Sequence, residues 1–94
     1  MNSMAMFPGA ELVQQGVADL RDGAVTVEAC LASMASPRLV RHGLLEETVC
    51  LVPEAELTLY RLLGQEAGDA YARYNSLVRR LVSFERALDH AGIC

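Results

Sequence analysis

Apolar residues in this chain recur at the spacing of a helix, and no stretch alternates convincingly with the period of a strand. Between its glycines and prolines the chain predicts helices over residues 8–21, 27–35, 37–42, 53–66 and 70–91. In the first of these, Val13, Val17 and Leu20 are spaced at i, i+4 and i+7. We therefore expect an all-α fold. It is a small helical bundle of about four main helices with a long C-terminal helix and one or two short extra helical turns.

The expected helix boundaries coincide with residues that favour such positions. Thr26, Ser36 and Asp69 each precede a predicted helix and are good N-caps, because a side-chain oxygen there accepts a hydrogen bond from the first turn. Gly43 follows the short helix and is its expected terminator. Gly16 lies inside the first helix, where it costs about 1 kcal/mol relative to alanine unless a neighbouring helix needs a close approach there.

Residues 44–52, LLEETVCLV, allow two interpretations. As a short helix the segment directs Leu45, Val49 and Val52 inward. As an extended piece it agrees with Pro53, since a residue that precedes proline is biased away from the helical conformation. We favour the helix.

The last helix carries the strongest pattern in the chain. Its apolar positions follow an a/d heptad repeat over three heptads. They are Ala70, Tyr74, Leu77, Leu81, Phe84, Leu88 and Ala91. Tyr71, Val78 and Val82 widen the apolar arc to about 180°, more than one bundle partner needs. Either two helices of the same chain cover this arc, or part of it is a homodimer surface. The predicted contact residues are Tyr71, Tyr74, Val78, Leu81 and Val82.

Length and composition indicate one folded domain over residues 1–94, with residues 1–7 disordered or loosely packed. The chain is 52% hydrophobic and 21% charged with a net charge of −4, which is typical of a globular protein. No apolar run is long enough to span a bilayer, and no basic leader precedes an apolar run, so we expect a cytoplasmic protein. Cys30, Cys50 and Cys94 form no close-spaced pair, and no disulfide framework is expected. All eight basic residues are arginine, which we interpret as a sign of a GC-rich bacterial genome.

No motif for catalysis, cofactor binding or metal binding stands out. The chain lacks a nucleophile elbow, a phosphate-binding loop and a dinucleotide fingerprint. His42 and His90 are the only histidines, and both lie at predicted helix ends, where a cation complements the helix dipole. Neither belongs to the two close-spaced ligand pairs that a structural zinc site needs. We therefore predict no enzyme, no cofactor, no metal and no small-molecule substrate.

The leading hypothesis is a non-catalytic helical interaction module, acting as a homodimer or as a subunit docked on another protein. The alternative is a small DNA-binding regulator in which Arg38 and Arg41 of the short helix contact the nucleic acid. Two arginines with acidic residues nearby make nucleic acid the less favoured partner. A third hypothesis, an enzyme that uses Cys30 or Cys50, requires a thiol of lowered pKa. No membrane partner is expected.

Overall fold

Five α-helices make up the described part of the chain, which covers residues 7–65 and 68–91 of this computed structural model. The bounds are Ala10–Arg21 for α1, Val27–Met34 for α2, Ser36–Arg41 for α3, Ala55–Gly64 for α4 and Ala70–Ala91 for α5. Helices hold 70% of the described residues, and no strand occurs among them. The predicted all-α class is confirmed. There are four main helices, and α3, six residues long, is the short extra one.

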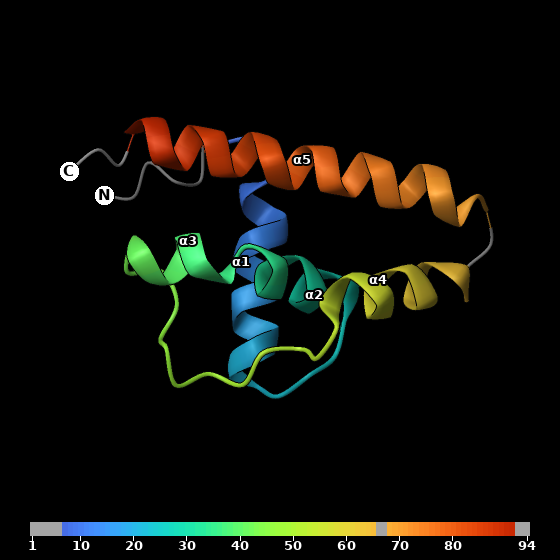
Figure 1. Cartoon of the computed structure of the whole chain (residues 1–94), viewed down its shortest axis with the longest axis horizontal. Helices are drawn as coiled ribbons and strands as arrows, with labels where there is room; N and C mark the ends of the chain where they lie inside the picture. The colour runs from blue at the N-terminus through green and yellow to red at the C-terminus, as the bar shows by residue number, and fades with distance from the viewer. Residues whose placement is uncertain (1–6, 66–67, 92–94) are drawn as a thin grey trace.

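The long helix α5 extends along one side of the molecule, and α1 runs crosswise to it (Figure 1). The helix α2 lies in the middle, where it packs against α1, α3 and α4, while α4 also packs against α5. The molecule measures 40 × 26 × 19 Å, so α5, with 22 residues, spans most of its long dimension. Within the described residues no helix is long and apolar enough to cross a membrane.

The hydrophobic core is built around α2. Its small residues allow neighbouring helices to approach closely, and Ala29, Cys30 and Leu31 have no exposed surface. The helix α4 adds Leu59 and Leu63 from its inner face. The heptad positions of α5 that are fully buried are Leu81, Phe84 and Leu88. Of the rest, Ala70, Tyr74 and Leu77 pack against this core, and the side chain of Ala91 lies outside the described part. The predicted inward face of the last helix is confirmed.

Capping side chains begin two of the helices as predicted. Thr26 Oγ1 accepts a hydrogen bond from the Ala29 backbone N–H at 3.0 Å and donates one to Asp19 at 2.6 Å, which ties α2 to α1. Asp69 Oδ1 accepts from the backbone N–H groups of Tyr71 and Ala72 at the start of α5. The predicted cap at Ser36 is wrong, because α3 begins at that residue, and Ala35 alone separates it from the end of α2 at Met34.

The favoured helix over residues 44–52 is wrong, because the segment forms bends and turns and no helix. Gly43 ends α3 with a φ of 76°, as predicted, and the chain then crosses the surface. Leu45 and Val52 are nevertheless buried. The Val52 backbone N–H donates to Ser33 Oγ at 3.0 Å, so a side chain of α2 supplies the partner that a helix would have provided.

Two long-range contacts hold segments outside the helices against the helices. Arg21 forms a two-pronged ion pair with Glu46, with N–O distances of 3.0 and 2.9 Å. Phe7 is half-buried, and its ring centroid lies 6.0 Å from that of Phe84. Phe7, the one described residue of the predicted loose N-terminus, thus has an aromatic contact with α5. The predictions for residues 1–6 and for Cys94 concern residues outside the described part.

Candidate functional site

A concave apolar surface lies between α4 and α5 and is here called the α4–α5 hollow. It encloses about 490 Å³ and is lined by Glu56, Leu57, Tyr60, Tyr71, Tyr74 and Asn75. Three of these side chains are large, apolar and exposed: Leu57 at 62%, Tyr60 at 44% and Tyr71 at 66%. The hollow therefore concentrates apolar surface that the fold of one chain leaves in contact with water.

Helical geometry explains why α4 presents this surface. Leu59 and Leu63, four residues apart, point into the core and orient the helix. Tyr60 is then turned to the edge, where its ring meets Tyr74 of α5 edge-on, with centroids 5.7 Å apart and planes at 81°. Leu57 lies off the buried stripe, as its sequence position predicts. The apolar spacing of this helix predicts one broad face of Leu59, Tyr60, Leu62 and Leu63, but Tyr60 is 44% exposed and lies at the edge of that face.

The structure divides the five predicted contact residues of α5. Tyr71 and Tyr74 line the α4–α5 hollow. Val78 and Val82 are half-buried and lie outside the core cluster. Leu81 is 4% exposed and belongs to the core, so it is removed from the predicted contact set. The reason is that Leu81 occupies the centre of the apolar arc, which the chain's own helices cover.

Sequence reasoning did not include Leu57 and Tyr60 in this contact set. The available signal was that Leu57 does not fit the apolar stripe of its own helix. A large apolar residue off the buried stripe points to solvent or to a partner. Only the pairing of α4 with α5 places Leu57 and Tyr60 beside Tyr71 and Tyr74.

A charged cluster joins α3 to the C-terminal half of α5. Arg38 Nε donates to Asp89 Oδ2 at 2.7 Å, and its Nη1 lies 3.6 Å from Glu85 Oε2. His42 Nε2 lies 3.3 Å from the other oxygen of Asp89. The hydrogen bond from Arg38 lowers the pKa of Asp89 from its ordinary value. Burial raises the pKa of Glu85, although Arg38 opposes that effect.

This cluster bears on the alternative hypothesis, in which Arg38 contacts nucleic acid. Its guanidinium is held between two carboxylates of its own chain, so it is not a freely extended phosphate ligand. Arg41 is exposed at the end of α3. Two arginines on a six-residue helix, one of them held by Asp89 and Glu85, are less than the basic stripe that is typical of a DNA-reading helix.

Replacing Asp89 by asparagine is expected to lower stability at neutral pH and to matter progressively less in acid. Because the folded-state pKa of Asp89 is lowered, its contribution is present above the ordinary aspartate pKa of about 3.9 and is lost as pH falls through the folded value. The raised pKa of Glu85 acts with the opposite sign, since its contribution is present at low pH and is lost as pH rises. Urea unfolding of wild type and Asp89→Asn at about pH 7 and about pH 3 measures the difference.

Asp22→Asn, which alters an exposed aspartate outside this cluster, is the control for that measurement. If the stability difference between wild type and Asp89→Asn is the same at both pH values, the carboxylate of Asp89 is not held by Arg38 in solution.

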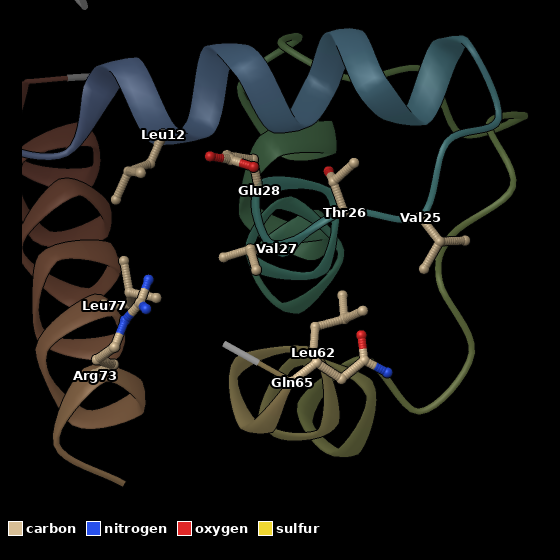
Figure 2. Close-up of a pocket in the computed structure, with 9 residues that line it drawn as sticks. All are labelled: Leu12, Val25, Thr26, Val27, Glu28, Leu62, Gln65, Arg73 and Leu77. Atoms are coloured by element: carbon tan, nitrogen blue, oxygen red, sulfur yellow. The ribbon is translucent and has the colours of Figure 1, made fainter. Parts of the chain in front are cut away.

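A second hollow, the α1–α5 groove, encloses about 670 Å³ among α1, α2, α4 and α5. Figure 2 shows Leu12, Val27, Leu62 and Leu77 around this groove, each from a different helix. Arg73 lies beside Leu77 at one end, and Val25 lies at the other. Polar groups line it as well, namely Thr26, Glu28, Gln65 and Arg73. The groove is wide and open, and its polar groups come singly from different elements.

The thiols and metal-ligating side chains gather into no reactive site in the described residues. Cys30 is buried in α2, and burial raises the pKa of its thiol, which disfavours the nucleophilic thiolate. Cys50 is exposed on the connection between α3 and α4. Within residues 7–65 and 68–91 no three side chains of His, Cys, Asp or Glu come together as a metal site would need.

Comparison with known proteins adds no family to this picture. The sequence matches no family model, and neither a curated protein nor a solved structure is similar to it. The candidate site is therefore defined by its geometry alone, and the α4–α5 hollow is the surface on which exposed apolar side chains converge.

Proposed function

We propose that this protein is a non-catalytic interaction module that forms a homodimer through the α4–α5 hollow. The observation that carries the proposal is the clustering of exposed apolar side chains at the α4–α5 hollow. Five large apolar side chains are exposed in the described part of the chain, and three of them, Leu57, Tyr60 and Tyr71, line this one hollow. Single exposed apolar residues need no explanation, whereas a group of them with a polar rim is typical of interfaces. Tyrosine is enriched in such interfaces.

The shape of the surface favours a second copy of the chain as the partner. The side chains of Leu57 and Tyr71 are exposed at the hollow, and the half-buried Tyr74 also lines it. A twofold interface brings the same surface of two chains together, so a rim side chain of one chain meets the hollow of the other. A chain of 94 residues has a modest core, and association adds the apolar burial that one copy lacks.

The other two hypotheses have less support. Arg38 is engaged by Asp89 and Glu85 instead of extending toward a nucleic acid. Cys30 is buried, with a pKa shifted away from reactivity. Cys30 and Cys50 are free thiols, which suits the reducing cytoplasm that we propose as the compartment.

Light scattering after size exclusion, with reductant present, tests the homodimer directly. We expect twice the chain mass of 10.2 kDa for the wild type. The Leu57→Glu variant is expected to weaken dimerisation at least about thirtyfold, the equivalent of a hot-spot loss of about 2 kcal/mol, because it places a charge in the apolar contact. Its helical circular dichroism is expected to stay at the wild-type level, since Leu57 is exposed in the single chain.

Leu51→Glu is the matched control, because Leu51 is also an exposed leucine, at 42%, and lies outside the α4–α5 hollow. This variant is expected to remain dimeric. A wild-type mass equal to one chain, or equal weakening by Leu51→Glu and Leu57→Glu, would contradict the proposed contact surface.

A further inference from the structure

Opposite charges border the two walls of the α4–α5 hollow. On the α4 wall stands Glu56, exposed and part of the lining. On α5, Asn75 lines the hollow, and Arg79 lies one helical turn beyond it on the same side. Arg79 is exposed, and within the described part of the chain neither Glu56 nor Arg79 makes an ion pair. The hollow therefore has an acidic side chain on its α4 wall and a basic side chain one turn beyond its α5 wall, and neither has an ion-pair partner among the described residues.

The neighbouring charges strengthen this division. Glu54 precedes Glu56 at the start of α4, and both are exposed. Arg86 follows Arg79 by seven residues on α5, which places it on the same helical face. The other basic side of α5 is already used, because Arg80 is paired with Glu11 of α1. Within the part of the chain that the structure describes, Arg79 and Arg86, on the side next to the hollow, make no ion pair.

We propose that α4 of one protomer packs on α5 of its partner, with Glu56 beside the partner's Arg79. This inference rests on the proposed homodimer and adds its orientation. Twofold symmetry requires the pairing twice, since Arg79 then lies beside the partner's Glu56. A pairing of each helix with its own copy leaves Glu56 and Arg79 without this attraction, because the acidic side chain is on α4 and the basic one on α5. The charges at the rim thus select one orientation of an interface whose apolar centre supplies most of the affinity.

Charge reversal tests the orientation. Glu56→Arg and Arg79→Glu each turn two attractive pairs into repulsive ones, and each is expected to weaken the dimer on the order of tenfold. An equimolar mixture of the two single variants is expected to form a heterodimer as tight as the wild type, because both of its pairs again join opposite charges. Native mass spectrometry identifies the heterodimer by its mass, and sedimentation gives the affinities. Glu47→Arg reverses an exposed acid outside the hollow and is expected to leave the dimer unchanged.

The outcomes separate this inference from the proposed function. If both single variants dimerise like the wild type while Leu57→Glu dissociates, the homodimer stands and the proposed orientation falls. If the Glu56→Arg/Arg79→Glu double variant recovers but the mixture of single variants does not, the two residues pair within one chain, which also overturns the orientation. If the wild type is monomeric, both proposals fail.

Discussion

Gly16→Ala is expected to destabilise the protein by at least about 2 kcal/mol, although alanine is the better helix former by about 1 kcal/mol. A Cβ atom built on Gly16 lies 2.2 Å from the carbonyl oxygen of Glu28 and 2.9 Å from Cβ of Ala32. The first of these contacts is with backbone, so no side-chain rotation relieves it. The helices α1 and α2 must move apart, and the loss of their packing exceeds the gain in helix propensity.

Thermal and urea unfolding of Gly16→Ala measure this loss. A domain of this size has a total stability of about 5–14 kcal/mol, so 2 kcal/mol is a large fraction of it and lowers Tm by roughly 8–16 °C. Gly64→Ala is the matched control, because Gly64 lies within α4 and a Cβ there meets nothing within 4 Å. That variant is expected to be as stable as the wild type or up to about 1 kcal/mol more stable. Equal stability of Gly16→Ala and wild type would show that α1 and α2 do not cross so closely.

The features predicted correctly from the sequence are those that local chemistry decides. Thr26 and Asp69 cap their helices because a hydroxyl or carboxylate at that position satisfies backbone N–H groups whatever lies around it. The heptad spacing of Leu81, Phe84 and Leu88 identifies the buried side of α5, since four-three spacing admits one inward face. Gly16 was a partial success, because its cost inside a helix implied a close neighbour without saying which one.

The errors concern residues whose environment depends on distant parts of the chain. Residues 44–52 are not helical, and the partner of the Val52 N–H is Ser33, nineteen positions earlier. Arg38, whose contact with nucleic acid stays a prediction, is likewise held by a distant residue, Asp89, fifty-one positions later. No pattern within either segment records these partners. A charge or a short apolar run therefore has several outcomes that only tertiary packing distinguishes.

The candidate site shows the same division. Tyr71 entered the predicted contact set because it broadens the apolar arc of α5 beyond what one neighbour covers, and Tyr74 because it is a heptad position at the edge of that arc. Tyr60 was misassigned, because a residue at the edge of a helical stripe turns inward or outward according to where the next helix lies. The opposite charges of Glu56 and Arg79 likewise border one hollow only because α4 and α5 pack side by side. A sequence thus indicates that a helix has surplus apolar surface before it indicates what borders that surface.

Phe84→Ala is expected to cost about 3–5 kcal/mol, the largest loss that we predict for a single substitution. Phe84 has no exposed surface and is the largest fully buried side chain of the described residues. Its removal leaves a cavity in the core beside α5, next to the ring of Phe7. Against a total of about 5–14 kcal/mol, this loss leaves a marginal fold. Chemical unfolding followed by circular dichroism measures it, and Phe84→Leu, which keeps most of the apolar volume, is expected to lose less.

A double-mutant cycle with Phe7→Leu is expected to give a coupling of about 0.5–1.5 kcal/mol, because the two rings meet at a tilt of 60°. A coupling of zero would show that the chain before α1 does not pack on α5, and a Phe84→Ala variant as stable as the wild type would place this helix outside the core.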